Sequence, residues 1–385
     1  MKEIILLDKN LKKLYPVDQF SSFIWAPKYN DIGDCELVIT ASNENLKKIR
    51  ECKYISYSDD EMDCEITKIE LKNDEEQGDQ LIVTGTDLKD ILNQRIVEKQ
   101  TNFNGYVEDY IRLLINDSII NPTNKDRKIE NFILDKKINF KEKIQQQVTY
   151  DYVGDKIKEL CEQFDLGYKV VIKDGKLVFS LYEGKDRSQY INFSPNFGNL
   201  LTSDYVQESG NMKNVALIAG EGEGTARTKI TIGSGVGINR KELYVDARDI
   251  SSKIDYDELK SNYPNGKIVT INNIFYYQVN NVNIAEITYD EKKEVKECIL
   301  CSDIYIQNLK NKGYDKMTEY VSSESFSGEI NSFKNYTYKK DYNLGDVIRI
   351  SNDYGITIKA RITEMIESMD ENGYKLSPTF EYLEK

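Results

Sequence analysis

A strictly alternating segment near the C-terminal end constrains the fold of this chain more than any other feature. Ile356, Ile358, Ala360 and Ile362 alternate with polar or charged residues at 357, 359, 361 and 363. Side chains of a β-strand point alternately to its two faces, so this pattern predicts a strand with one buried face. Turn residues at 352–355 and 372–373 bound the segment, and an apolar run at 347–350 precedes it. We therefore expect a half-buried antiparallel hairpin over 347–362.

The first hundred residues carry the same kind of signal in shorter runs. Apolar or alternating runs are separated by clusters of turn residues, and they cover 4–7, 21–25, 35–40, 53–57, 64–71 and 81–84. Strands this closely spaced indicate a β-barrel or a β-sandwich. A short helix is predicted to begin at Asp87, because Leu88, Ile91 and Leu92 recur at helical spacing.

The following segments mix helices with strands. Apolar stripes predict helices at 107–115 and 153–164, and the second leads into a predicted hairpin in which Asp174-Gly175 joins 168–172 to 176–180. Strands return from about residue 195, and the run 215–219 is apolar throughout, which predicts burial on both faces. A further helical pattern lies near 292–310. The layout is β-rich, mixed and β-rich again, with helices inserted.

Composition excludes several classes of function. The 385 residues suffice for two or three domains of about 150 residues each. The chain has no histidine, which excludes His-dependent nucleophilic catalysis, imidazole acid/base chemistry and His-containing zinc sites. Its 27 tyrosines suit β-structure and protein interfaces. No run approaches the ~20 apolar residues of a membrane span, so we expect folding in the cytoplasm without stable membrane insertion.

The charge balance limits the partners. Against 52 basic residues stand 65 acidic ones, which gives a net charge of −13. A protein held to nucleic acid by phosphate neutralisation is basic or carries a basic stripe, and the sequence shows neither. We expect nucleic acid that comes near this protein to pass without specific binding.

The six cysteines include one pair with motif spacing, Cys298-Ile-Leu-Cys301. A redox Cys-x-x-Cys usually lies where a strand meets a helix N-terminus, whereas this pair falls inside the predicted helix. One such pair cannot complete a four-cysteine zinc site. We interpret the cysteines as reduced core residues, with a redox or metal role as the minor alternative.

Two glycine-rich loops, 220–224 and 233–237, invite comparison with phosphate-binding motifs. A dinucleotide fingerprint needs Gly-x-Gly-x-x-Gly between a strand and a helix. Gly220-Glu-Gly-Glu-Gly224 has different spacing, contains two glutamates and precedes a strand-like run at 228–231. We interpret it as a turn packed at a seam between subunits or domains, with nucleotide binding as the minor alternative.

Other candidate residues have simpler interpretations. The acidic clusters 59–61 and 74–76 are typical of solvated loops, and no carboxylate pair is placed in a cleft as glycoside hydrolysis requires. The segment 370–373 lacks the later ligands of an EF-hand and is predicted to be a hairpin turn. Trp25, the only tryptophan, is predicted to be a core or interface anchor, with sugar stacking as the alternative. We therefore assign no catalytic, cofactor-binding or metal-binding residue.

Short motifs spread across nearly the whole chain occur in an order that resembles a family of phage-tail hub proteins, the gp-thirty-seven-like family. The N-terminal motifs are Ser22-Phe-Ile-Trp25, Tyr29, Gly33-Asp-Cys-Glu-Leu37, Thr84-Gly-Thr-Asp-Leu88, Leu92 and Arg95-Ile96. The central motif is the segment 214–224 with Arg227, and the C-terminal ones are Tyr338, Asp341-Tyr342, Leu344-Gly345-Asp346 and the strand 355–364.

The resemblance implies a β-rich α+β multidomain fold like that of a baseplate hub, with two β-barrel domains and smaller inserted α+β domains. In that interpretation residues 1–100 form the first barrel, and 195–250 with 320–385 form the second. Residues 101–194 and 251–319 are the insertions. The family is also similar to the N-terminal part of tail-associated lysins. This chain stops at Lys385 soon after its last predicted strand, so we expect no catalytic module to follow.

The resemblance also implies a function. We expect a non-enzymatic structural protein of a phage or a phage-tail-like bacteriocin, located at the tail tip or baseplate after assembly in the host cytoplasm. Three copies would form a ring that joins the sixfold tail tube to the threefold tip, and an acidic lumen would let DNA pass. The implied partners are a tail tube or distal tail protein, a tip, spike or hydrolase protein, and the tape-measure protein. The alternative is a host-surface protein that binds or cleaves carbohydrate. Neither a cofactor nor a metal is expected.

Overall fold

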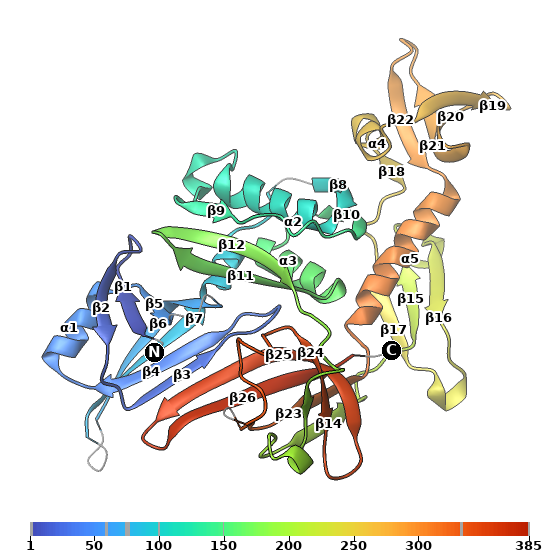
Figure 1. The fold of residues 1–385 in the computed structure, drawn as a ribbon. Coiled ribbons are helices and arrows are strands. Elements are labelled where there is room, and N and C mark those ends of the chain that lie inside the picture. Colours follow the sequence, from blue (N-terminus) through green and yellow to red (C-terminus); the bar gives the residue numbers. More distant parts are fainter. Residues whose placement is uncertain are drawn as a thin grey trace. The chain divides into compact units, whose positions relative to one another are not determined.

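The computed structural model describes residues 3–57, 61–73, 78–98, 101–148, 150–331 and 334–383. The chain divides into two compact units (Figure 1). Unit 1 comprises residues 1–206 and 324–385, and unit 2 comprises residues 207–323.

Unit 1 is built on one sheet of 13 strands. From the N-terminal part come β1 (Ile4–Leu7), β2 (Lys13–Val17), β3 (Ser22–Ala26), β4 (Asp34–Thr40), β5 (Tyr54–Tyr57), β6 (Asp63–Lys72) and β7 (Gln80–Asp87). The later strands are β13 (Asn192–Phe193), β14 (Asp204–Glu208), β23 (Ser323–Ser327), β24 (Val347–Ser351), β25 (Thr357–Asp370) and β26 (Gly373–Tyr382). The main path is β14-β23-β26-β25-β3-β4-β7-β6-β5-β1-β2, with β24 on β25 and β13 on β24.

Strands β3 and β25 join the two β-rich parts of the chain. They pair antiparallel, with Trp25 opposite Glu367. The hairpin predicted over 347–362 is confirmed as β24 and β25. The β-rich α+β class is also confirmed, but no sheet within the described ranges closes into a barrel. The two barrels predicted for 1–100 and for 195–250 with 320–385 are wrong for the single chain, because the β3–β25 pairing joins the first region to β23–β26 in one open sheet, whereas β15–β17 form a separate sheet.

Aromatic side chains fill the core beneath the N-terminal strands. Trp25 is fully buried, with its ring centre 5.7 Å from the stacked ring of Phe23 and 5.6 Å from the edge-on ring of Tyr57. Such pairs add about 0.5–1.5 kcal/mol beyond the burial of their area. The prediction that Trp25 is a core anchor is confirmed.

The other elements of unit 1 are helices and small sheets inserted between these strands. They are α1 (Asn43–Glu51), the 3-10 helix η1 (Leu88–Gln94), β8 (Thr101–Tyr106), α2 (Val107–Ile115), the π-helical turn η2 (Asn116–Ile120), η3 (Lys125–Arg127), β9 (Phe132–Leu134), β10 (Lys143–Val148), α3 (Val153–Gln163), β11 (Leu166–Lys173), β12 (Lys176–Glu183) and η4 (Pro195–Phe197). Strand β8 pairs with β10, and β11, β12 and β9 form a second small sheet. The predicted helices at 107–115 and 153–164 are confirmed. So is the hairpin at Asp174-Gly175, whose two positive φ angles suit a tight turn.

Unit 2 contains two sheets and two α-helices. Its elements are β15 (Val215–Ala219), η5 (Gly224–Ala226), β16 (Lys229–Gly233), η6 (Gly237–Asn239), β17 (Glu242–Asp246), β18 (Lys253–Ile254), α4 (Tyr256–Asn262), β19 (Lys267–Ile271), β20 (Ile274–Val279), β21 (Val282–Tyr289), β22 (Val295–Leu300) and α5 (Ser302–Thr318). Strand β15 lies between β16 and β17. In the five-stranded sheet β19–β22 form a meander, and β18 pairs with β22. Helix α5 packs against the three-stranded sheet, with Gly313 close to the side chain of Ile218. Four residues of β15 are buried and Leu217 is exposed, so the predicted burial of both faces holds for most of the strand.

Two expectations differ from what unit 2 shows. The strands at 215–246 belong with residues 251–319, whereas we expected them to fold with 320–385. The helix predicted near 292–310 is wrong in its first half, where β22 precedes α5. Cys298 and Leu300 face the core at a spacing of two residues, so the period there is that of a strand. No helix in the described residues is long and apolar enough to cross a membrane.

Candidate functional site

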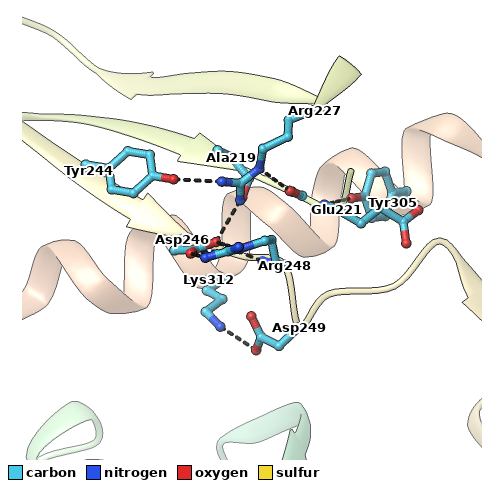
Figure 2. A network of polar contacts seen from close by, with 10 residues as sticks. Ala219, Glu221, Arg227, Tyr244, Asp246, Arg248, Asp249, Tyr305 and Lys312 are labelled. Atoms are coloured by element: carbon cyan, nitrogen blue, oxygen red, sulfur yellow. Dashed lines mark hydrogen bonds and ion pairs between the residues drawn. The ribbon is translucent and has the colours of Figure 1, made fainter. Parts of the chain in front are cut away.

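The central glycine motif lies in unit 2, where the loop after β15 is fastened by Arg227 (Figure 2). The Arg227 Nε donates to the carbonyl of Gly220 at 2.7 Å, and Nη1 donates to the Tyr244 hydroxyl at 2.8 Å. Nη2 donates to the carbonyl of Ala219 and to Asp246 Oδ1, the latter at 2.7 Å. One guanidinium therefore ties the end of β15 to β17. Because four of its five N–H groups are already engaged, it is not available to grip a phosphate.

Asp246 forms the acidic half of this network. Its carboxylate also receives bonds from Arg248, whose Nη2 lies 2.5 Å from Oδ2 and whose Nε lies 3.0 Å from the same oxygen. Hydrogen bonds from Arg248, and then from Arg227, hold the pKa of Asp246 well below its usual range. The carboxylate stays ionised at neutral pH and is unsuited to act as a general acid.

Helix α5 closes the other side of the glycine loop. The backbone N–H of Glu221 donates to the Tyr305 hydroxyl at 3.0 Å, and the Glu221 carboxylate accepts from the backbone N–H of Ser252 at 3.1 Å. Lys312 on the same helix pairs with Asp249 (Figure 2). A Cβ at position 220 would lie 2.3 Å from the Tyr305 hydroxyl, so the glycine is required by close approach of the helix.

The structure supports the interpretation of 220–224 as a packed turn. The loop leads through η5 into strand β16, so it lacks the helix N-terminus on which a dinucleotide fingerprint places its pyrophosphate. The Glu221 carboxylate accepts from the backbone N–H of Ser252 and from the hydroxyl of Ser251, both in the same unit, and Glu223 is exposed. Its position at a seam between subunits or domains stays a prediction.

The Cys298–Cys301 pair lies at the junction of a strand and a helix, and not inside a helix as predicted. Cys298 is in β22 and Cys301 is the N-cap of α5, so the pair does lie where a strand meets a helix. Burial, followed by the charges of nearby acidic groups, raises the pKa of both thiols. A raised thiol pKa disfavours the nucleophilic thiolate, which supports the interpretation as core residues on different grounds.

Of the acidic clusters 59–61 and 74–76, the structure describes only Glu61, and this residue is paired with neighbouring side chains. Asp59, Asp60 and the cluster 74–76 lie outside the described residues. Glu61 pairs with Lys339 at 3.2 Å and accepts from the Tyr338 hydroxyl at 2.6 Å. The predicted turn at 370–373 is confirmed as the connection of β25 and β26. In the described part of the chain no group of three or more acidic or cysteine side chains is arranged to hold a metal ion.

Unit 1 contains a buried ion pair that no sequence pattern predicted. Lys89 is 1% exposed, and its ammonium donates to the carbonyls of Lys28 at 2.7 Å and Asp31 at 2.5 Å. It also lies 3.3 Å from the equally buried carboxylate of Asp87, and 5.0 Å from the ring centre of Tyr168. Burial raises the pKa of Asp87, although Lys89 opposes that shift. This pair fixes the turn before β4 against the end of β7.

Tyr29, in the same turn, connects three segments of unit 1. Its hydroxyl donates to the carbonyl of Asp165 at 2.8 Å and accepts from the backbone N–H of Gly184 at 3.0 Å. The guanidinium of Arg361 in β25 lies 5.3 Å from its ring centre. Burial raises the pKa of Tyr29 to about 12. The motif residues Tyr29 and Asp87 thus have structural roles, which their order in the sequence did not reveal.

Two solved structures share this fold across nearly the whole chain. A tail protein from Neisseria meningitidis MC58 is 11% identical with a TM-score of 0.54, and the alignment covers 99% of this chain and 96% of that one. The 43 kDa tail protein of prophage MuSo2 from Shewanella oneidensis is 9% identical with a TM-score of 0.53, covering 98% of each chain. At these identities the likeness concerns the fold.

Sequence comparison gives the family. No curated protein matches the chain. The family model described as Siphovirus ReqiPepy6 Gp37-like protein matches residues 3–380, which is nearly the full length. The order of motifs and this match agree, and the chain belongs to the Siphovirus ReqiPepy6 Gp37-like family.

Proposed function

We propose that this protein is a non-enzymatic hub at the tail tip or baseplate of a phage or phage-tail-like particle. Three copies form a ring that joins the sixfold tail tube to a threefold tip. The observation that carries the proposal is the family match over residues 3–380, in a chain whose strands β1–β7 form one continuous sheet with β13, β14 and β23–β26. If each copy presents two positions to the tube, three copies give the six positions that a sixfold tube requires.

The edges of the large sheet support assembly with neighbours. An open sheet presents unpaired backbone groups at its outer strands, and proteins usually cover or block them. At one edge β2 contains Pro16, which has no N–H to donate and blocks further pairing. At the other edge the mostly exposed β14 contains no proline. A closed threefold ring needs two different contact faces on each copy, and this asymmetry fits that requirement.

The distribution of charge supports a channel that passes DNA. Residues 207–323 contain 15 basic and 17 acidic side chains, so unit 2 accounts for only −2 of the total of −13. Unit 1, which carries the large sheet, holds the remaining −11. A wall of this sign repels phosphates and lets nucleic acid pass without sticking. Where a genome is carried, it passes through this ring.

The partners follow from a position between tube and tip. They are a tail tube or distal tail protein on one side, a tip, spike or hydrolase protein on the other, and the tape-measure protein in the lumen. The site chemistry supports the absence of catalysis, because Arg227, Asp246 and Glu221 are engaged in fastening a loop.

Native mass spectrometry of the full chain and imaging of purified particles test this proposal. We expect a homotrimer, and density for three copies at the tail tip. A strict monomer at all concentrations, together with absence from particles, would overturn it. Release of sugars or peptides from purified host cell wall by the isolated protein would overturn the non-enzymatic part alone.

A further inference from the structure

Strand β19 is an unprotected edge of the five-stranded sheet in unit 2. The order of that sheet is β18-β22-β21-β20-β19, so within the described residues β19 pairs with β20 alone (Figure 1). Proteins usually block a sheet edge by making the strand short or by placing prolines and charged side chains in it. The opposite edge, β18, has only two residues. Strand β19 has five residues, no proline and a single charge, that of Lys267.

The turn between β19 and β20 determines which backbone groups point outward. Both residues of the turn, 272–273, have positive φ angles, 50° and 64°, which is the type I′ turn of a two-residue hairpin loop. Such a turn makes Ile271 and Ile274 a hydrogen-bonded pair, and non-hydrogen-bonded and hydrogen-bonded pairs then alternate along the two strands. The N–H and C=O groups of Ile268 and Thr270 therefore point away from β20, to the side where the described residues place no strand.

The side chains along this edge are apolar and partly exposed. Ile268 and Ile271 are each 40% exposed, and so is Phe275 beside them in β20. All four residues at 268–271 are β-branched, a type that packs well against a neighbouring strand. Single exposed aliphatic residues are common on protein surfaces, but here they coincide with unpaired backbone groups on one strand. An edge of this kind is suited to receive another β-strand.

The edge is complementary to a second copy of itself. Ile268 and Thr270 flank Val269 symmetrically, so two β19 strands can pair antiparallel with Val269 opposite Val269. Ile268 of each copy then lies opposite Thr270 of the other, and all outward backbone groups are used in two pairs that exchange two hydrogen bonds each. In this register Lys267 lies opposite Ile271 of the second copy, so no like charges face each other. A second copy meets these requirements of spacing and charge by construction.

We infer that the β19 strands of two copies pair antiparallel about a twofold axis at Val269 and join their two sheets into one. The contact is isologous, because each copy contributes the same strand. It differs from the two unlike faces that the proposed threefold ring needs, and it does not depend on that ring. Two short strands form a smaller contact than a standard stable interface, so the association is transient and depends on concentration.

Opposite charges at position 269 test the pairing and its register. Val269 is partly exposed, and V269K or V269E alone places like charges opposite each other, whereas a mixture of the two variants places opposite charges there. In sedimentation velocity we expect the full-length wild type to form a species of twice its mass. Each variant alone should raise the dissociation constant of that step at least about tenfold, and the mixture should restore it. V282K is the matched control, because Val282 is 53% exposed in the inner strand β21; it should leave the constant unchanged.

Hydrogen exchange of single amides gives an independent measurement. The N–H groups of Ile268 and Thr270 should gain protection as the concentration rises, whereas the N–H groups of Val269 and Ile271 are bonded to β20 at every concentration. Absence of mass doubling in the wild type up to about 1 mM, or doubling by V269K and V269E alone as in the wild type, would overturn the inference. Protection of amides 268 and 270 in purified particles but not in the isolated chain would assign the edge to a strand of another protein, and would equally overturn the pairing of two copies.

Discussion

Replacing Lys89 by methionine should destabilise unit 1 more than any surface substitution. The change keeps the length of the side chain and removes the only cation that lies on the buried carboxylate of Asp87 in the described network. Removing one partner of a buried ion pair typically costs about 3–5 kcal/mol, because the other charge remains without compensation. The free energy of unfolding of a folded protein is about 5–15 kcal/mol in total, so a loss of this size is readily measured.

The second variant separates the charge from the other contacts. In D87N/K89M both charges are absent, and the single side-chain oxygen of the asparagine can still accept the shorter of the two bonds, from the backbone N–H of residue 89, while the long bond from the Gly33 N–H is lost. The remaining deficit is then mainly the loss of a donor for the carbonyls of Lys28 and Asp31, at about 1–3 kcal/mol. The double variant should therefore be more stable than K89M. The interaction free energy between the two substitutions, measured by the double-mutant cycle, should be about 2 kcal/mol.

The pH dependence has a definite sign. Burial raises the pKa of Asp87 above 3.8 in the folded protein, and loss of Lys89 removes a charge that opposes this shift. A carboxyl group with a raised folded pKa binds its proton more tightly in the folded state than in the unfolded one. The deficit of K89M should thus be full at pH 7 and shrink as the pH falls toward 3.8.

Urea unfolding followed by tryptophan fluorescence reports on unit 1 alone, because Trp25 is the only tryptophan and is fully buried there. The measurement compares wild type, K89M, D87N and D87N/K89M at pH 7 and pH 5. A loss below about 1 kcal/mol in K89M, or a deficit independent of pH, would refute the account of a buried and uncompensated charge.

Three further predictions concern other groups. Y29F should cost unit 1 about 1–3 kcal/mol in the same urea experiment, since it leaves the Gly184 N–H without its acceptor and changes no packing; a neutral substitution would contradict the role of the hydroxyl. R227K keeps the charge but loses the planar fork, so hydrogen exchange at 215–219 should become faster, with K229R unchanged as control. Because burial raises the pKa of Cys301, its alkylation at pH 7.5 should be slower than that of a model thiol and should accelerate in urea; equal rates would mean an exposed thiolate.

The spacing of apolar residues predicted those helices and strands whose pattern lies within one short segment of the sequence. The stripes at 107–115 and 153–164, the Asp-Gly turn and the alternation at 356–362 all have a single structural interpretation, and each was confirmed. The run through Cys298 failed because apolar residues of a strand and of the following helix form one mixed pattern. Helix α1 was missed although Ser42 caps it, because Ile49 is its only fully buried residue.

The candidate sites could be predicted only where they depend on neighbours in sequence. The turn character of 220–224 follows from its own composition. The roles of Tyr29 and Lys89 depend on Asp165, Gly184 and Tyr168, which lie far away in the chain. Lysine is almost always exposed, so composition gave no reason to expect a buried one. The joining of β3 to β25 is likewise a long-range pairing that no local pattern encodes.

That pairing determines when the protein can finish folding. About 330 residues separate the end of β3 from the start of β25. At about 5–20 residues per second, the ribosome needs roughly 15–65 s to make this interval. During that time β3 has β4 beside it on one edge only, and the other edge is open to unwanted pairing. A nascent chain therefore covers the open edge of β3, an inner strand of the finished sheet, only near the end of synthesis, and chaperones that bind extended segments should be found on it until β25 emerges.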